Sequence, residues 1–409
     1  MKSKKCRICS NQNLKKFLSL GTTPLANSFL TKEQLKEKEK KFPLELCFCG
    51  KCKFVQLTYI VPSEDMFSNY VYLSSTTRTF QLHFARMAEE ITRDFKLDKN
   101  SLAVDIGSND GILLKEFKKF GVKVIGVEPA ANVAKIAEQA GIETINGFFS
   151  KKVVMEIIKR KGKADVVTAT NVFAHIDDID SVIKNVKGLL KRDGTYVIEI
   201  QYFVDTLEQM TFDNIYHEHM SYYTLTSLDF FFKKHGMEII KVKKVPTHGG
   251  SLRVFVQRKE GNNKIDGSVK QILEYEKKFG VDDFDTYKKF ADNVYNIKNR
   301  LVDYIRKIKK ENKKIAAYGA PAKGNTLLNF CGIGKNEIEY IVEDNQLKQG
   351  MYSPGTHIPV VHPKALDIKK PDYILILAWN FADEILEKTK KYGDKGVKFI
   401  VPLPEPRIV

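Results

Sequence analysis

Short apolar runs alternate with amphipathic stretches through the middle of the chain. Apolar residues recur at helical spacing over 111–119 and 132–141. Between these stretches lie runs long enough for one buried strand each, at 102–106, 123–127, 165–170 and 196–200. Such alternation predicts a mostly parallel, doubly wound α/β sheet with helices on both faces.

The same pattern returns near the C-terminus. A charged, helix-rich connector at 264–314 is followed by strand-like runs at 315–318, 337–343, 373–378 and 397–401. Residues 1–68, in contrast, hold five of the six cysteines and few helical patterns. The sequence therefore predicts three units: a small N-terminal module at 1–68, a doubly wound α/β domain at 69–261, and connector helices with a Rossmann-like α/β domain at 262–409.

The bulk composition is that of a folded protein with several domains. At 409 residues the chain exceeds what one hydrophobic core supports, and 43% hydrophobic residues are typical of globular proteins. No run of 18 apolar residues occurs, and the opening Met-Lys-Ser-Lys-Lys is not followed by an apolar segment. We therefore expect a cytoplasmic monomer with no membrane partner.

A net charge of +17 raises the question of nucleic-acid binding. Lysine far outnumbers arginine, however, and the lysines gather on helix-like segments such as 159–163 and 307–314. Base recognition favours the guanidinium fork over the lysine point charge. We interpret the charge as a solvated surface that helps to attract a phosphorylated small molecule, and we expect no nucleic-acid partner.

Two C-x2-C pairs stand about forty residues apart in the N-terminal module, Cys6-Arg-Ile-Cys9 and Cys49-Gly-Lys-Cys52. Each tight turn lets two thiolates reach one ion, and the two pairs together complete a tetrahedral zinc site. The alternative is a set of free thiols. A four-thiolate site has no open position, so this zinc is expected to be structural. Cys47 is interpreted as a buried bystander.

Small residues follow the first predicted strand in the loop Asp105-Ile106-Gly107-Ser108-Asn109-Asp110-Gly111. The loop lacks the G-x-G-x-x-G spacing and the lysine that dinucleotides and triphosphates require. Its D-x-G-x-x-x-G pattern resembles motif I of class I methyltransferases, which implies S-adenosylmethionine as the cofactor. An acid at the end of the second strand, Glu128, can hold both ribose hydroxyls.

The third and fourth strands lead into segments that line the adenine and methionine ends of the cofactor in such folds. Phe148 and Phe149 could equally belong to the ordinary core. The predicted cofactor-binding residues are Asp105, Gly107, Asn109, Asp110, Gly111, Glu128, Pro129, Phe148, Phe149 and Asn171.

Titratable side chains crowd the segment 213–219 after the strand at 196–200. A metal site at His217 and His219 is one reading, although the spacing is not H-E-x-x-H on a helix. A structural network is another. General acid–base chemistry is favoured because imidazole titrates near neutral pH. Strand alternation would separate the histidines from Tyr216 and Glu218, so convergence requires an irregular loop.

With these motifs the chain resembles, over its whole length, the sugar C-methyltransferases that act on nucleotide-linked 4-keto deoxysugars. Besides the cysteine pairs and the cofactor loop, the matching motifs are PLANSF at 24–29, FSNYVY at 67–72, IYHEH at 215–219, HGGSLR at 248–253 and GAPAKGN at 319–325. The resemblance implies that His219 is the general base. It places four further residues in the active site around it: Tyr216, Glu218, Tyr70 and His175.

In that chemistry a C4 ketone acidifies the proton at C3, so that a base and oxyanion donors produce an enolate that attacks the methyl group. The expected partner is a nucleotide-linked 4-keto sugar. The segment 319–324 has P-loop spacing, but Asn325-Thr326 replaces its Lys-Ser/Thr, which argues against a triphosphate. Lys323 could hold a diphosphate; a domain without ligand is the alternative. The expected substrate-binding residues are Tyr72, His217, Lys323 and Asn325.

Three other functions remain as alternatives. An O- or N-methyltransferase on a sugar or another small metabolite would need a base but no enolising ketone. An RNA methyltransferase is less favoured because the cysteine module lacks aromatic residues interleaved with arginines. A binding protein on a methyltransferase scaffold would have no use for the acid–base cluster.

Overall fold

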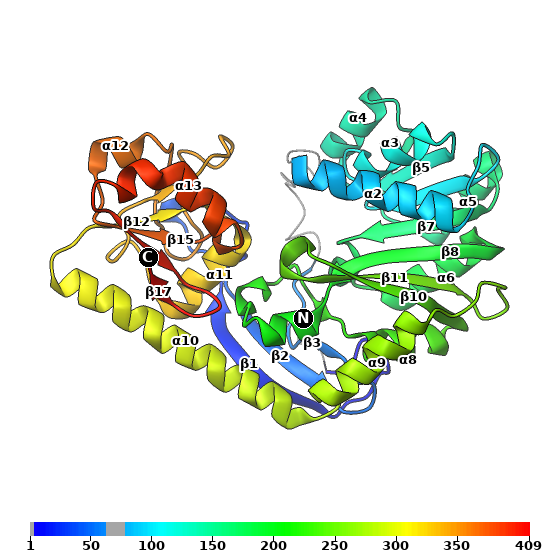
Figure 1. Ribbon diagram of the computed structural model, residues 1–409, viewed down its shortest axis with the longest axis horizontal. Coiled ribbons are helices and arrows are strands. Elements are labelled where there is room, and N and C mark those ends of the chain that lie inside the picture. The colour runs from blue at the N-terminus through cyan, green and yellow to red at the C-terminus, as the bar shows by residue number, and fades with distance from the viewer. Residues whose placement is uncertain (1–3, 63–77) are drawn as a thin grey trace.

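Three sheets form two lobes and the base between them (Figure 1). The computed structural model describes residues 4–62 and 78–409. In Figure 1 the seven-stranded sheet lies on the right and the six-stranded sheet on the left, with the four-stranded sheet of the N-terminal module below and between them. The expected doubly wound α/β class with a second α/β unit is confirmed.

The seven-stranded sheet is parallel from β8 to β6 and ends in two strands joined by antiparallel pairing. Its spatial order is β10 (Met237–Val245), β11 (Ser251–Arg258), β8 (Leu190–Gln201), β7 (Ala164–Thr170), β4 (Leu102–Ile106), β5 (Lys123–Glu128) and β6 (Thr144–Asn146). Four of these strands contain the runs that the hydrophobic pattern predicted, because each is buried on both faces.

Alternate residues of these strands pack against helices on opposite faces, as the two-residue period of a strand requires. Ala103 contributes to the core under one set of helices and Val104 to the core under the other. The first set comprises α2 (Arg78–Asp94), α3 (Ile112–Lys119) and α4 (Ala131–Gln139). The second comprises α5 (Lys151–Lys161), α6 (Ile179–Leu189) and α8 (Leu225–Lys234), and the short α7 (Phe203–Glu208) follows β8.

The six-stranded sheet repeats this plan on a smaller scale. Its order is β14 (Val360–Val361), β13 (Ile341–Val342), β12 (Ile315–Tyr318), β15 (Tyr373–Ile376), β16 (Lys398–Val401) and β17 (Arg407–Ile408), and only β17 is antiparallel. The associated helices are α11 (Ala322–Cys331), α12 (Ala365–Lys369) and α13 (Ala382–Gly393). The strand expected at 337–343 is shorter than predicted, because Glu337 Oε2 accepts the N–H of Gly334 at 2.8 Å and closes a turn there.

The N-terminal sheet joins the two lobes. It consists of β1 (Leu14–Thr23), β2 (Phe42–Cys49), β3 (Val55–Leu57) and β9 (Ser221–Tyr222), the last contributed by the chain that follows the segment 213–219. The connector forms α9 (Gly267–Phe279) and α10 (Phe284–Lys310), and a stripe of buried residues on α10 shares one core with β1 and the C-terminal sheet. Figure 1 shows α10 running beneath both.

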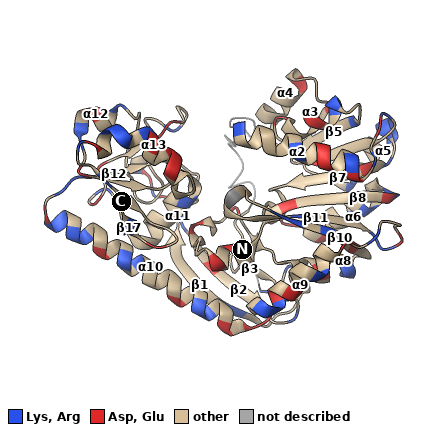
Figure 2. Ribbon diagram, in the orientation of Figure 1, with Lys and Arg blue, Asp and Glu red and all other residues tan. Residues whose placement is uncertain are grey.

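Charged side chains spread over the outer helices. Figure 2 shows Lys and Arg recurring along α10, α12 and α5, interrupted by Asp and Glu. This agrees with the interpretation of a solvated lysine-rich surface. No helix within residues 4–62 and 78–409 is long and apolar enough to cross a membrane.

Candidate active site and metal centre

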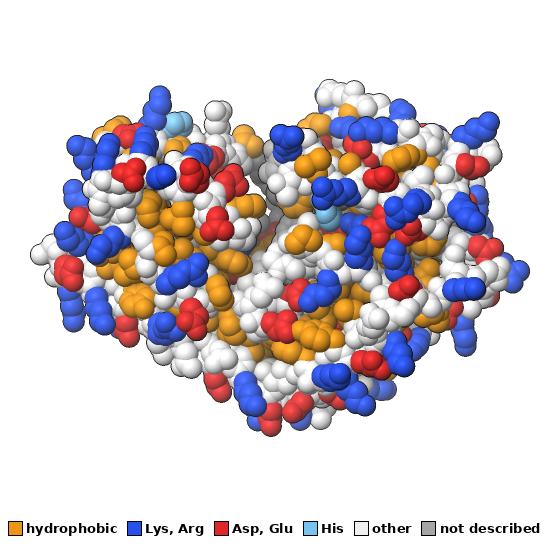
Figure 3. Space-filling view, viewed as in Figure 1, with side chains coloured by type: hydrophobic (Ala, Val, Ile, Leu, Met, Phe, Trp, Pro, Cys, Tyr) orange, Lys and Arg blue, Asp and Glu red, His pale blue; other side chains and the backbone are white. Residues whose placement is uncertain are grey.

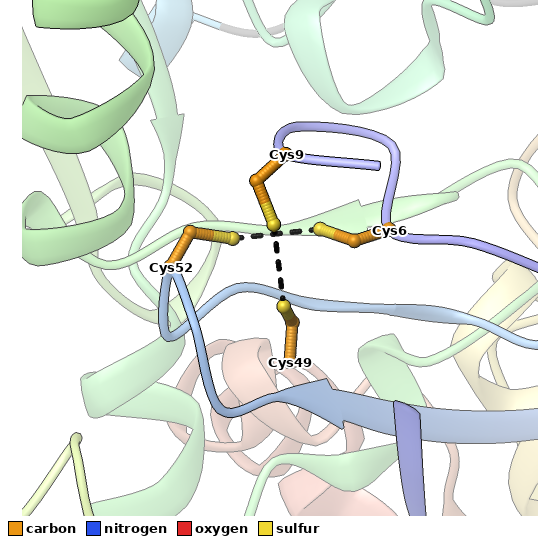
Figure 4. Close-up of side chains that lie close together, drawn as sticks. All are labelled: Cys6, Cys9, Cys49 and Cys52. Carbon is orange, nitrogen blue, oxygen red and sulfur yellow. Dashed lines mark hydrogen bonds between the residues drawn. The ribbon is translucent and has the colours of Figure 1, made fainter. Parts of the chain in front are cut away.

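The four cysteine sulfurs Cys6, Cys9, Cys49 and Cys52 converge on one point (Figure 4). All four Sγ atoms lie within 4.8 Å of one another, and the Cys6–Cys52 and Cys9–Cys49 pairs are 3.4 and 3.5 Å apart. A Zn–S bond of about 2.3 Å spaces tetrahedral thiolates by about 3.8 Å. The donor set therefore fits zinc and leaves no position for substrate.

The two turns that present these thiols are built alike. In each, the residue after the second cysteine donates its N–H to the first cysteine's carbonyl: Ser10 to Cys6 at 2.9 Å and Lys53 to Cys49 at 2.8 Å. Both residues have a positive φ. Cys47 stands apart, since its thiol donates to the carbonyl of Gln56 and burial raises its pKa to about 12. This agrees with its interpretation as a bystander.

The predicted cofactor loop is a tight turn between β4 and α3. Gly107, Asn109 and Gly111 all have a positive φ. At Gly107 a side chain is also excluded by space, because a Cβ would lie 2.6 Å from Val172. The loop thus passes close to the segment after β7, where Asn171 donates its N–H to Glu199 O at 2.7 Å. Asp110 is buried in the same turn.

Glu128 closes this cradle at the end of β5. Its carboxylate accepts N–H groups from both sides, from Asn109 at 3.0 Å and from Ala130 at 2.9 Å. Burial raises its pKa, and these two hydrogen bonds act in the opposite direction. Each carboxylate oxygen has a second lone pair, so the group retains acceptor capacity for two hydroxyls. The cradle therefore fits a ribose-containing cofactor.

The other residues predicted for the cofactor lie around this cradle. Asp105 is fully buried beneath it, accepts the Thr168 hydroxyl at 2.6 Å, and has its pKa raised to about 7 by burial. Phe148 is 67% exposed, so the ordinary-core alternative is wrong for it, whereas Phe149 packs against the core. Pro129 is exposed next to Glu128.

The segment 215–220 is an irregular turn, as convergence of its side chains requires. His219 donates its N–H to Tyr216 O at 2.9 Å, and their rings lie 4.0 Å apart. The ring of His175, from the 3-10 helix at Phe173–His175, lies 5.1 Å from that of His219. Met220 donates to Ala174 O and joins the two segments. Tyr216, His175 and His219 therefore form one partly exposed cluster.

His219 is oriented by a backbone contact. Its Nδ1 lies 2.9 Å from the carbonyl oxygen of Asn214. A carbonyl can only accept, so Nδ1 carries the proton in this contact. The neutral ring therefore has its basic lone pair on Nε2.

The side chains of His217 and Glu218, which lie between Tyr216 and His219 in the chain, point away from this cluster. His217 is buried against Phe42, with Nε2 3.2 Å from the Phe42 carbonyl, and burial lowers its pKa to about 4. It lies close to Tyr216 and Asn325. Glu218 is 7% exposed, and both its oxygens accept from Asn27 Nδ2, at 2.8 and 3.0 Å.

Lys323 and Asn325 lie near the start of α11, and Lys323 is close to Asp213 of the segment 213–219. The Lys323 ammonium stands 4.9 Å over the ring of Trp379, whose Nε1 donates to buried Asp213 at 2.6 Å. Burial lowers the pKa of Lys323, and the Asp213 carboxylate opposes this shift. Asn325 is buried and donates to Ala26 O at 2.8 Å. Tyr70 and Tyr72 lie outside the described residues.

Three contact residues in this region did not stand out in the sequence. Asn27 holds Glu218, Trp379 holds Asp213, and Arg7 donates to the carbonyl oxygens of Ile176 and Asp177 next to His175. Asn27 lies inside the PLANSF motif, which was the one available signal. Trp379 and Arg7 belong to no recognisable motif, and their partners are far away along the chain.

Comparisons with known proteins agree with this three-part structure. A family profile described as a methyltransferase domain matches residues 80–242, one for a zinc binding domain matches residues 6–67, and one described as the C-methyltransferase C-terminal domain matches residues 246–404. The C-methyltransferase NovU of Streptomyces niveus is 36% identical over 404 residues, 99% of this chain and 96% of that protein.

Other similarities are confined to part of the chain. The ubiquinone biosynthesis O-methyltransferase of Pelagibacter ubique is 29% identical over 116 residues, 27% of this chain and 48% of that protein. An S-adenosylmethionine-dependent methyltransferase from Anabaena variabilis, a solved structure, is 14% identical with a TM-score of 0.38, covering 50% of this chain and 99% of its own.

The relative at 36% identity spans almost the whole chain, and the zinc, methyltransferase and C-terminal profiles match in the same order. The protein therefore belongs to the C-methyltransferase family and is an S-adenosylmethionine-dependent C-methyltransferase with an N-terminal zinc-binding domain.

Proposed function

We propose that this enzyme methylates C3 of a nucleotide-linked 4-keto deoxysugar through an enolate, with His219 as the general base. The observation that carries the proposal is the contact of His219 Nδ1 with the carbonyl of Asn214. It leaves the basic lone pair on Nε2, in a partly exposed cluster between the two lobes. An imidazole held in this tautomer can remove a proton from carbon.

The surrounding side chains suit the charges that develop during proton removal. Tyr216 and His175 stand beside His219 and can donate hydrogen bonds to the oxyanion at O4. Glu218 precedes His219 in the chain, and we propose that its negative charge favours the imidazolium that His219 becomes. Tyr70 is proposed as a further catalytic residue and Tyr72 as a substrate-binding residue.

S-adenosylmethionine, when bound, supplies the electrophilic methyl group. We assign its ribose to Glu128 and its adenine to the side of exposed Phe148, since both follow neighbouring strand ends. The remaining loop residues shape the cradle: Asp105, Gly107, Asn109, Asp110, Gly111, Pro129, Phe149 and Asn171. His217 is buried against Phe42, so any effect on the substrate would be indirect, through the turn that also carries Tyr216.

The C-terminal unit is proposed to hold the nucleotide part of the substrate. Lys323 and Asn325 begin α11, whose N-terminus favours a phosphate group. Figure 3 shows the surface hollowed between the lobes, so that a nucleotide on one lobe could present its sugar to the other. We place the domain borders after residues 68 and 261.

The decisive test is product analysis. Purified enzyme would be incubated with S-adenosylmethionine and a panel of nucleotide-linked 4-keto sugars, and the products analysed by mass spectrometry and NMR. A new methyl group on C3 is the expected result. A product methylated at another carbon would correct the position, and no methylated product from any 4-keto sugar would refute the substrate class.

A further inference from the structure

A loop of the zinc-binding module lies between the catalytic turn and the C-terminal unit. The loop, residues 24–30, is fixed to the C-terminal unit at both ends of its path. Asn325 Nδ2 donates to Ala26 O at 2.8 Å, and Leu30 and Tyr352 exchange backbone hydrogen bonds of 3.0 and 2.8 Å. The loop is therefore held in place independently of the side chain at its centre.

That central side chain is Asn27, and it reaches the catalytic turn. Asn27 is exposed, whereas Glu218 is buried to 7% exposure. The single amide nitrogen of Asn27 donates to both oxygens of the Glu218 carboxylate, at 2.8 and 3.0 Å. The two residues are 191 positions apart in the chain. The module thus contributes a polar contact directly to the turn that carries His219.

The contact with Asn27 and a nearby lysine both oppose the effect of burial on Glu218. Burial raises the pKa of Glu218, while the Asn27 amide and the Lys348 ammonium act to lower it. Lys348 approaches from the C-terminal unit, where its Nζ donates to Ala320 O at 2.8 Å and lies 5.0 Å over the ring of Phe29. Burial lowers the pKa of Lys348, and the carboxylates of Glu343 and Glu218 oppose this shift. The pKa of Glu218 therefore lies above its ordinary value despite these two contacts.

We propose that Asn27 is a positioning residue that holds the Glu218 carboxylate, one residue before His219 in the chain, in one orientation and in its ionised form. The inference rests on the proposed function in assigning proton removal to His219. An ionised Glu218 stabilises the imidazolium, and a carboxylate with both oxygens bound to one amide cannot rotate freely. The zinc-binding module then has a second role, because folding around zinc delivers Asn27 to the active site.

The test compares four variants of the full-length protein. Asn27→Leu has a similar shape but cannot donate, Asn27→Gln retains the amide, and Glu218→Gln removes the charge. Ser28→Ala, at an exposed neighbouring position, is the control. Methyl transfer to a 4-keto nucleotide sugar gives kcat, KM and the pH profile. Calorimetry with S-adenosylhomocysteine monitors the cofactor site.

For Asn27→Leu we expect kcat to fall about 10–100-fold, as for a displaced active-site group, with cofactor affinity within twofold of wild type. Loss of the amide removes an influence that lowers the pKa of Glu218, so the acidic limb of the pH profile should move up by about one pH unit. Asn27→Gln should recover most of the activity. An unchanged kcat and pH profile in Asn27→Leu would overturn the proposal.

A second readout separates this inference from the proposed function. If wild type methylates no 4-keto sugar, the proposed function fails, but Glu218 can still be titrated. Protein labelled with ¹³C at the glutamate carboxyl is titrated by NMR without substrate, and Glu218→Gln identifies the signal. Asn27→Leu should raise the midpoint of that signal by about one pH unit. An unchanged midpoint would refute the role of Asn27 whatever the substrate is.

Discussion

Glu128 and Glu343 accept matching pairs of backbone hydrogen bonds in two different sheets. Glu128 is the last residue of β5 and Glu343 follows β13 directly, and each accepts one N–H from the loop after the preceding strand, at 3.0 and 2.7 Å. Each accepts a second N–H from the residue two positions further on, at 2.9 Å in both cases. The loops match as well, since Gly107 and Gly319 both have a positive φ and donate across to the second strand at 2.8 Å.

This correspondence predicts a nucleotide contact at Glu343. Glu343→Ala should weaken the binding of nucleoside diphosphates by about 1.5–3 kcal/mol, the range for lost hydrogen bonds to a charged group. Trp379 is the single tryptophan of the chain and lies under Lys323, so its fluorescence can report the titration. Glu339→Ala, an exposed acid just before the same strand, should bind like wild type. Equal affinities for both variants would reassign Glu343 to loop structure.

Removal of the Glu128 carboxylate should weaken the binding of S-adenosylmethionine. Glu128→Ala is expected to weaken S-adenosylmethionine binding by about 1.5–3 kcal/mol, because the ribose hydroxyls lose a charged acceptor. Isothermal calorimetry measures this directly. Glu138→Ala, an exposed acid on α4, is the matched control. Unchanged affinity in Glu128→Ala would mean that the carboxylate serves only to fix the loop.

The zinc site should contribute to folding. One zinc ion per chain is expected by elemental analysis, and Cys49→Ser should lose it and unfold at a lower temperature, because metal binding is coupled to folding. Cys47→Ser is a close control, since its thiol contacts the Gln56 carbonyl and lies outside the cluster. Metal-free wild type, or a Cys49→Ser protein with unchanged Tm, would contradict the assignment.

His219→Asn should retain both ligands and lose turnover by about 10²–10⁴-fold, the range for a positioned general base. Wild type mixed with a 4-keto sugar nucleotide and S-adenosylhomocysteine in heavy water should exchange the C3 proton, and the variant should not. Glu218→Gln and Tyr216→Phe should show smaller losses. His362→Asn, an exposed histidine of the C-terminal unit, controls for loss of an imidazole. Near-normal turnover in His219→Asn would exclude it as the base.

The burial of Asp105 should make the stability of the fold depend on pH. Burial raises the pKa of Asp105 to about 7, above its value in the unfolded chain. The folded state therefore binds the proton more tightly, and stability falls as the pH rises from about 4 to about 7. Asp105→Asn avoids this loss while keeping an oxygen to accept the Thr168 hydroxyl.

Thermal unfolding would be measured without cofactor. As the pH rises from 4 to 8, the free energy of unfolding of Asp105→Asn should increase relative to that of wild type by about 2–4 kcal/mol. Asp94→Asn is a useful contrast, because ion pairing with Lys241 lowers the pKa of Asp94. Its difference from wild type should have the opposite pH trend. A stability difference for Asp105→Asn that does not vary with pH would disprove the raised pKa.

The local pattern of the sequence was sufficient for the features that depend on short spacings. The cysteine cluster followed from two C-x2-C turns, because the covalent spacing alone brings two thiols to one ion. The strand at 102–106 and the loop behind it followed from an apolar run that ends in small residues. Positions 337–343 were misjudged because a hydrogen bond from Gly334 to Glu337 makes a turn where the strand was expected to begin, and the strand starts only at Ile341.

Tertiary structure decided which side chains of the segment 213–219 meet which partners. No residue pattern shows that the turn directs His217 towards Phe42 and His219 towards His175, because a turn abolishes strand alternation. Nor does any local signal pair Asn27 with Glu218, since that contact depends on how a loop of the zinc-binding module packs between two lobes. Short-range spacing therefore determined the zinc ligands and the cofactor loop, whereas long-range packing determined the geometry around His219.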